Sequence, residues 1–160
     1  MMRGMGDALP VDVFAEALAL FADHGAATYA ERVTMEHHAR QAAALASAAG
    51  ADDALVLAAL LHDVGHFLDQ PDSEFGVTEH GAIGGAWVAA RFVEAVSEPV
   101  RLHVAAKRYR CFVDPGYEAE LSPASVGTLR LQGGPMSAVE AAAFESEPFA
   151  AAALAVRGWD

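Results

Sequence analysis

The sequence predicts an all-helical protein that forms a single domain over residues 1–160. Hydrophobic residues make up 54% of the chain, and Ala is prominent among them. Ala is a strong helix former, whereas the β-branched residues typical of strands are sparse between the expected turns. Ser, Thr and Asp precede several apolar stretches and Gly follows them, which is the pattern of helix starts and stops. A chain of this length buries a substantial core, and no repeat or linker divides it.

The first predicted helix covers about residues 11–23. Phe14, Leu18 and Phe21 recur at helical spacing and are expected to lie on one face. Gly25 follows the last periodic residue and is expected to end the helix. The segment that comes next, residues 28–33, has no helical period.

A second helix is predicted between Thr34, a good N-cap, and Gly50. It carries two adjacent histidines, His37 and His38, which point about 100° apart on a helix and so cannot both face one metal ion. The expected apolar face consists of Ala42, Leu45 and Ala49. Because His38 precedes the first two by whole turns, it belongs to that face, and His37 is assigned to solvent.

The third predicted helix is organised around the uninterrupted apolar run of residues 55–61, with Asp52 and Asp53 as N-cap candidates. Apolar residues on every side of a helix indicate burial, so this helix is expected to run through the middle of the domain. Three polar residues close the stretch: His62, Asp63 and His66. His62 and His66 are one helical turn apart, so on a continuous helix they would share a face. Burying an imidazole and a carboxylate without partners is costly, and a metal ion would satisfy both. The alternative is a hydrogen-bonded core histidine near a helix end.

The next two helices bring further histidines. Residues 68–77 are rich in turn residues, after which Thr78 is expected to cap a helix through about residue 93, with His80 in its first turn. Three glycines on that helix indicate close approach to a neighbour: Gly81, Gly84 and Gly85. Pro99 fits the first turn of the following helix, which carries His103 and, one turn on, Lys107. Taken alone, Lys107 is best explained as a surface lysine.

Shorter helices complete the chain. Ser122 and Pro123 are expected to begin one that ends at residues 133–135, and Ser137 with Glu140 forms a capping box for the next. A last helix is expected after Pro148.

Charge and cysteine content exclude several classes of function. A net charge of −12 argues against binding a nucleic-acid backbone. The single cysteine, Cys111, rules out an internal disulfide framework and suits a reducing compartment. The first residues lack an apolar leader, and no apolar run reaches membrane-spanning length. We therefore expect a cytoplasmic protein without membrane or nucleic-acid partners.

Six side chains are candidate metal ligands: His38, His62, Asp63, His80, His103 and Asp160. Three of the histidines lie on separate predicted helices, in addition to the adjacent pair His62–Asp63. Four imidazoles and two carboxylates suit two first-row transition ions, with Asp63 free to bridge them through its two oxygens. The absence of thiolates among them disfavours a structural zinc site.

The His62–Asp63 pair, followed by Gly65 and His66, resembles the HD-domain superfamily, whose members hold one or two metal ions with such a pair. Three further segments narrow the resemblance: residues 101–109, 121–126 and 131–136. They resemble the HD-domain mixed-valent diiron oxygenases that cleave organophosphonates, distant relatives of myo-inositol oxygenase. The likeness covers about residues 28–160 and implies a helical bundle around a dinuclear site.

The resemblance also implies a role for each candidate residue. The first iron would be held by His38, His62, Asp63 and Asp160, and the second by Asp63, His80 and His103. The positions that hold the phosphonate are Lys107, Ser125 and Arg157, and His66 lies on the substrate side. Glu31 matches the glutamate that recognises the substrate's amino group. The family's capping tyrosine would fall at Thr28, so either the loop is shifted to bring Tyr29 into its place or the cap is lost.

The activity implied is O2-dependent cleavage of the C–P bond of a 1-hydroxyphosphonate, with two iron ions, Fe(II) and Fe(III), as cofactor. The match at Glu31 favours 2-amino-1-hydroxyethylphosphonate or an N-methylated analogue, giving glycine or its analogue and phosphate. An Fe(II)/2-oxoglutarate hydroxylase would supply this substrate. One alternative is a metal-dependent HD phosphohydrolase acting on a nucleotide or other phosphate monoester. Another is a non-catalytic HD module, which would be expected to lack some of the ligands.

Overall fold

A computed structural model describes residues 12–160, and this part of the chain is all-helical apart from one isolated bridge between Ser73 and Gly76, which confirms the predicted fold class. Its α-helices are α1 (Val13–His24), α2 (Met35–Ala48), α3 (Asp53–Leu61), α4 (His80–Ala89), α5 (Glu94–Val113), α6 (Pro123–Leu131), α7 (Ala138–Glu145) and α8 (Ala150–Trp159). Two short 3-10 helices, η1 (Val64–Phe67) and η2 (Tyr117–Glu120), lie between them. Val11, the expected first residue of the first helix, lies outside the described residues.

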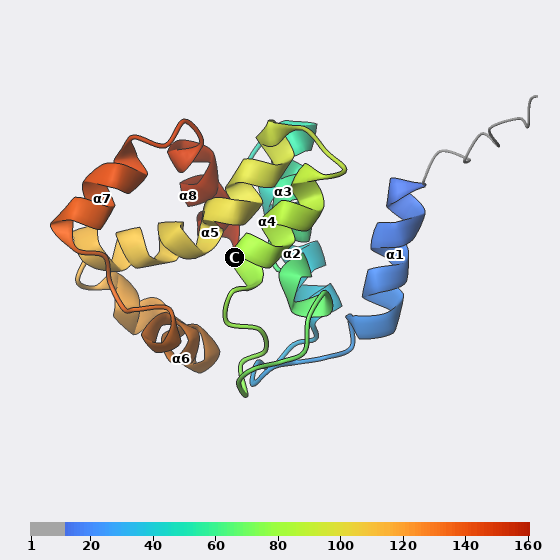
Figure 1. Ribbon diagram of the computed structural model, residues 1–160, viewed down its shortest axis with the longest axis horizontal. Coiled ribbons are helices and arrows are strands. Elements are labelled where there is room, and N and C mark those ends of the chain that lie inside the picture. The colour runs from blue at the N-terminus through green and yellow to red at the C-terminus, as the bar shows by residue number, and fades with distance from the viewer. Residues whose placement is uncertain (1–11) are drawn as a thin grey trace, which may run out of the picture.

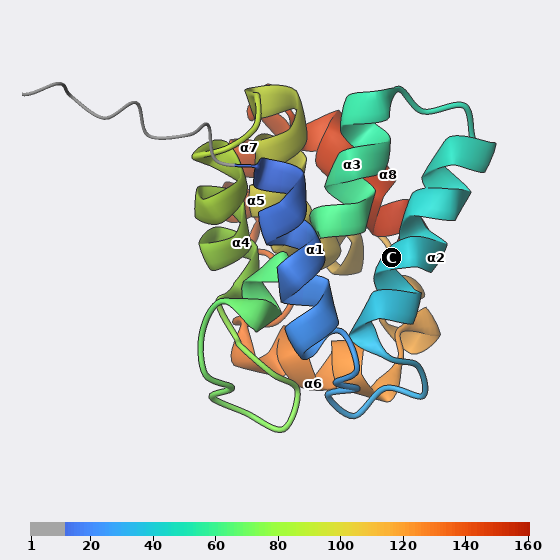
Figure 2. The ribbon, with the colours of Figure 1, turned by 90° about the vertical axis from the view of Figure 1, so that its right-hand side faces the viewer.

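The longest helix, α5, lies at the centre of the arrangement (Figure 1) and packs against α3, α4, α7 and α8. Helix α2 packs against α3 and α8 on the other side of the core. Figure 2 shows that α6, the segment between α1 and α2, and the loop before α4 gather at one end of the bundle. The C-terminal end of the chain lies among the helices in both views.

Several helix starts form as the sequence predicts. The side chain of Thr34 accepts a hydrogen bond from the backbone N–H of His37, and Asp52 accepts one from Leu55. Ser122 caps α6, and Ser137 with Glu140 forms the expected capping box of α7. These contacts satisfy backbone N–H donors that have no partner inside the helix. The capping residue lies only two or three positions from the donor, so the helix start can be predicted from the local sequence.

The middle helices differ from expectation at their ends. Helix α3 stops at Leu61, so His66 lies on η1 and does not share an α-helical face with His62. Thr78 does not cap α4, because its hydroxyl donates to Asp72 at 2.8 Å, and α4 runs only from His80 to Ala89. Helix α5 begins at Glu94, directly after Val93, whose backbone is extended. Pro99 therefore lies inside the helix and not, as the sequence predicts, in its first turn.

Two expected apolar faces are also corrected. On α1, Phe14 and Leu18 are 65% and 71% exposed, and Phe21 packs against the core with its ring edge-on to Phe67. Leu45 and Ala49 of α2 are exposed, whereas the buried residues of that helix are Met35, Ala39, Ala42 and Ala46. Helix α3 is not enclosed on every side: its buried residues are Ala58, Ala59 and Leu61, residues 54–57 are half-buried, and Asp53 is exposed. A one-sided helix shows the same period whether or not another element covers that side.

The glycines of α4 have the close contacts that the sequence predicts. A Cβ atom at Gly85 would lie 2.7 Å from Cβ of Arg101 on α5, and one at Gly84 would lie 2.9 Å from the backbone nitrogen of Gly65 on η1. Helix α4 therefore approaches both neighbours at backbone distance, and the first residue of α4, His80, is brought beside His103 of α5. No helix within residues 12–160 is both long and apolar enough to cross a membrane.

Candidate metal centre

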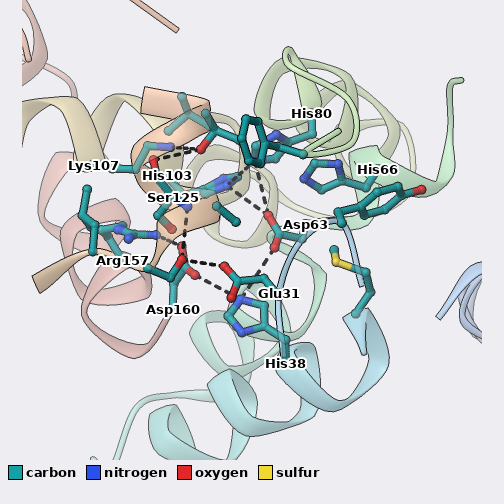
Figure 3. A pocket seen from close by; sticks show the side chains of 18 of the residues that line it. Glu31, His38, Asp63, His66, His80, His103, Lys107, Ser125, Arg157 and Asp160 are labelled. Atoms are coloured by element: carbon teal, nitrogen blue, oxygen red, sulfur yellow. Dashed lines mark hydrogen bonds and ion pairs between the residues drawn. The ribbon is translucent and has the colours of Figure 1, made fainter. Parts of the chain in front are cut away.

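The six candidate ligands gather at a cavity of about 500 Å³ (Figure 3), although they come from five separate elements. Five of them line the cavity, and the sixth, His62, is fully buried beside Asp63. His38 lies on α2, His80 begins α4 and His103 lies in α5. The other three ligands stand at helix ends: His62 after α3, Asp63 before η1 and Asp160 after α8. The end of α3 at Leu61 thus turns His62 and Asp63 toward the same space.

The carboxylate of Asp63 faces two groups of imidazoles with its two oxygens. Its Oδ2 lies 3.2 Å from Nε2 of His62 and 3.6 Å from Nε2 of His38. Its Oδ1 lies 3.3 Å from Nε2 of His80 and 3.4 Å from Nε2 of His103. Asp160 completes the first group, with its Oδ1 3.0 Å from Nε2 of His38. This is the geometry of a carboxylate placed to bridge two cations.

Backbone carbonyls orient three of the rings in the same way. Nδ1 of His62, His80 and His103 lies 2.7, 2.9 and 2.7 Å from the carbonyl oxygen of the residue three positions earlier. A carbonyl only accepts, so each Nδ1 carries a proton, and each Nε2 faces the centre, where it can bind a metal ion when it carries no proton of its own. Such contacts fix the tautomer of metal-binding histidines.

Two features of this arrangement require a positive partner at the Nε2 atoms. Nε2 of His62 is buried and has no hydrogen-bond partner among residues 12–160. Nε2 of His80 and Nε2 of His103 lie 3.1 Å apart, where two lone pairs would repel each other. Ligands about 2.1 Å from one ion and at right angles lie about 3 Å apart, so these spacings suit shared metal ions. The nitrogen and oxygen donors therefore fit a dinuclear transition-metal centre.

The electrostatics of the carboxylates favour the same conclusion. Burial alone would raise the pKa of Asp63, but the positive charge of protonated His62, with His103 and His80 close by, holds it well below its usual range. For Asp160, the charges of Arg157 and His62 similarly outweigh burial and lower the pKa. Burial would lower the pKa of His62, yet both carboxylates raise it well above the usual value. The charges that stabilise a proton at Nε2 of His62 would stabilise a metal cation there.

His66 lies close to Asp63 and His80, but its hydrogen bonding separates it from the ligands. Its Nδ1 accepts the backbone N–H of Val77 at 3.0 Å. Burial lowers the pKa of His66, so the ring is neutral and carries its proton on Nε2. A protonated nitrogen cannot bind a metal, whereas His103 presents a free one next to Asp63. The structure thus favours His103 over His66 as a ligand and gives His66 one N–H donor.

Basic side chains form the wall of the cavity next to the carboxylates. Lys107 is only 4% exposed, and its Nζ donates to the hydroxyl of Thr128 at 2.8 Å, so it is not the surface lysine that its position alone would suggest. Arg157 is also buried and pairs with Asp160. Ser125, in the first turn of α6, lies on the same wall (Figure 3). Two buried cations and a hydroxyl beside the candidate ligands are groups that could bind a small anion.

Comparison with known proteins decides which HD-domain family this is. The hydroxymethylphosphonate dioxygenase of Gimesia maris is 44% identical over 146 residues, which cover 88% of this chain and 73% of that protein. The glycine-betaine-forming 1-hydroxy-2-(trimethylamino)ethylphosphonate dioxygenase of Leisingera caerulea is 43% identical over 138 residues, covering 81% of this chain and 68% of its own length. The chain belongs to the HD-domain oxygenases that cleave organophosphonates. No family model matches the chain.

In this phosphonate-cleaving oxygenase, Glu31 and Tyr29 come from the segment between α1 and α2, and both line the cavity. Glu31 accepts a hydrogen bond from the Ser122 hydroxyl at 2.5 Å. Tyr29 and Ala30 both have left-handed backbone, with φ of 43° and 67°, and the ring of Tyr29 stacks on His66 at 5.3 Å. Two consecutive left-handed residues that are not glycine are uncommon, so tertiary contacts hold this loop in place.

Among the cavity residues that sequence reasoning missed are Thr128 and Tyr117, which bond to the two buried cations. Thr128 was predictable, because it follows Ser125 by one helical turn and therefore shares its face of α6. Tyr117 was not, because η2 is a single turn without periodic pattern, and nothing local places its hydroxyl 2.7 Å from Nε of Arg157.

Proposed function

We propose that this protein uses two iron ions and O2 to cleave the C–P bond of a 1-hydroxyphosphonate, giving a carboxylate and inorganic phosphate. The observation that carries the proposal is Asp63, which divides its two oxygens between two groups of imidazoles beside a buried anion site. The two relatives of this chain, from Gimesia maris and Leisingera caerulea, are dioxygenases of hydroxylated phosphonates, which supports the same reaction for this protein.

The proposed iron ligands are the residues already described. The first iron would be held by His38, His62, Asp63 and Asp160, and the second by Asp63, His80 and His103. Bound there as an Fe(II)/Fe(III) pair, the metals would supply the redox chemistry that activates dioxygen. Nitrogen and oxygen ligands without thiolates suit iron in this role.

The remaining polar groups would bind and orient the substrate. Lys107 and Arg157 would hold the phosphonate through charge-assisted hydrogen bonds, with Ser125 as a further donor. Because both cations are buried, they would act in a medium that screens them less than water. This local positive wall would allow an acidic protein to bind an anion. The Nε2–H of His66 would donate to an oxygen of the substrate and help to orient the carbon that reacts.

The stoichiometry of the proposed reaction is complete with one O2. For hydroxymethylphosphonate, the products formate and phosphate contain two more oxygen atoms than the substrate, and both come from O2. The C–P bond and a C–H bond break, and one proton is released. No external reductant is consumed.

Glu31 supports a substrate that carries an ammonium group. Its carboxylate lines the same cavity as the metal ligands and is held by Ser122. We propose 2-amino-1-hydroxyethylphosphonate or an N-methylated analogue as substrate, with glycine or its analogue as product. Such a substrate needs prior hydroxylation at the carbon next to phosphorus, a reaction suited to an Fe(II)/2-oxoglutarate hydroxylase. A reducing cytoplasm would keep ferrous iron and the Cys111 thiol available.

The proposal is tested by loading the protein with iron under nitrogen, then adding O2 with 2-amino-1-hydroxyethylphosphonate or hydroxymethylphosphonate. Phosphate release should require both iron and O2. Phosphate release under strict anaerobiosis, or from a phosphate monoester, would overturn the oxygenase and favour the phosphohydrolase.

The role of Glu31 is tested by the variant Glu31→Gln, which keeps the size and the contact to Ser122. Its kcat/KM should fall by about 10-fold to 100-fold for the amino substrate, because the ammonium would enter without its counter-charge. It should change little for hydroxymethylphosphonate, which has no ammonium. An equal loss with both substrates would remove the amine-recognition role and leave the oxygenase reaction in place.

A further inference from the structure

The cavity contains a tyrosine hydroxyl for which the proposed reaction has no role. Tyr117 lies on η2, is buried and lines the cavity. Its hydroxyl oxygen accepts a hydrogen bond from Nε of Arg157 at 2.7 Å. The face of its ring is covered by the guanidinium of Arg110, whose central carbon lies 3.8 Å from the ring centroid. A ring held in this way fixes where its hydroxyl can lie.

The hydrogen bonds of Arg157 show what this contact does. A guanidinium has five N–H donors in one plane. The Nε–H bonds to Tyr117, and the first terminal nitrogen bonds to Asp160 (Figure 3). With both ends of the plane held, the guanidinium cannot rotate, and its other N–H groups have a set direction in a cavity that also contains Lys107 and Ser125.

The same contact extends to a candidate metal ligand. Asp160 binds Arg157 with Oδ2 and approaches His38 and His62 with Oδ1. An anion bound by Arg157 would therefore share the guanidinium with Asp160. The Tyr117 hydroxyl fixes the orientation of the guanidinium, because it accepts from Nε while the first terminal nitrogen is bonded to Asp160.

We propose that Tyr117 is a positioning residue that holds the Arg157 guanidinium so that it both supports Asp160 and faces the phosphonate. This inference rests on the proposed function, since it assigns Arg157 to the phosphonate. It adds that the anion site depends on a hydroxyl from η2, a segment that supplies no metal ligand.

The test is a double-mutant cycle that combines Tyr117→Phe with Arg157→Lys. The phenylalanine keeps the ring and its contact with Arg110 and removes only the hydroxyl. The measured quantity is the Kd of iron-loaded protein for hydroxymethylphosphonate and for inorganic phosphate, determined by calorimetry under nitrogen. Tyr109→Phe is the matched control, because it also loses one hydroxyl hydrogen bond, to Glu145 at 2.7 Å, but on the exposed side of α7.

Tyr117→Phe should weaken binding of both anions by about 5-fold to 10-fold, as expected for one lost hydrogen bond. In the Arg157→Lys background the same change should cost less than about 2-fold, because the lysine has no Nε to be held. Tyr109→Phe should leave both Kd values unchanged. Equal losses in the two backgrounds, or an equal loss in Tyr109→Phe, would overturn the positioning role.

The outcome separates the two proposals. If the wild-type protein binds and cleaves the phosphonate while Tyr117→Phe binds it equally well, only the role of Tyr117 is wrong. If the wild-type protein binds neither anion, the proposed function and the inference are both wrong.

Discussion

Lys107 shows how burial gives an ordinary residue a specific property. Burial and the nearby charge of Arg157 together lower its pKa from 10.5 to about 8, against the smaller opposing effects of Asp160 and Asp63. The amine is therefore charged at neutral pH but titrates within the range in which enzymes are assayed. In the proposed anion site the charged amine would bind a phosphonate more strongly than the neutral one, so binding would depend on this titration.

The pH dependence of kcat/KM should therefore have a limb that falls as pH rises through about 8, which reports the free enzyme. Lys107→Arg should remove that limb, because arginine stays charged. Lys107→Met should weaken substrate binding by about 1.5–3 kcal/mol below pH 8 without changing the iron content. Arg40→Met, which removes an exposed cation from α2, is the control. An unchanged affinity in Lys107→Met would remove Lys107 from the anion site.

Among the elements, α4 and η1 depend most on small residues. A Cβ atom at Gly65 would overlap the backbone carbonyl of His80, so any side chain at this position separates η1 from α4. These two elements carry or adjoin ligands of both groups, since Asp63 precedes η1 and His80 begins α4. The backbone contact thus sets the distance between the bridging carboxylate and one of its imidazoles.

Gly65→Ala should lower the free energy of unfolding by about 1–3 kcal/mol through overpacking, and should reduce the iron bound per chain. Chemical denaturation and metal analysis measure the two effects. Gly158→Ala is the contrasting change: no heavy atom lies within 4 Å of the added Cβ, and alanine favours the helix, so stability should rise by about 0.5–1 kcal/mol. Wild-type stability in Gly65→Ala would show that η1 can shift without cost.

At the scale of the whole molecule, the metal ligands connect elements that are distant in the sequence. Six side chains from α2, the end of α3, α4, α5 and the end of α8 lie at or beside one cavity. An ion that binds only the folded arrangement stabilises it by mass action. Metal binding by the proposed ligands would therefore be coupled to folding.

Adding Fe(II) under nitrogen should raise the Tm of metal-free protein, and metal analysis should find about two irons per chain. Asp63→Ala should lose both ions and the rise in Tm, because it alone faces both groups of imidazoles. His37→Ala should keep both, since His37 is exposed although it adjoins His38. Retention of two irons by Asp63→Ala would contradict the bridging role.

The sequence alone determined the features that depend on neighbours in the chain. Apolar periodicity and composition predict helices, and Thr34, Asp52, Ser122 and Ser137 mark helix starts, because a cap bonds to a backbone group only two or three residues away. Each side chain able to bind metal can also be recognised from its residue type, and the number of such side chains indicates two ions. The apolar period of the second helix favours His38 over His37, and resemblance to a family then assigned the candidate ligands to two ions.

Tertiary structure decided everything that depends on contacts between distant segments. It decided that Leu45 is exposed, that Lys107 is buried, and that α5 is the central helix. It also distinguished His103, a candidate metal ligand, from His66. Only the hydrogen bond from the backbone N–H of Val77 shows which nitrogen of His66 carries the proton. Tyr117 reaches Arg157 across forty residues of sequence. The physical reason is that burial and hydrogen bonding are set by the elements that pack on a residue, and no local pattern records which elements these are.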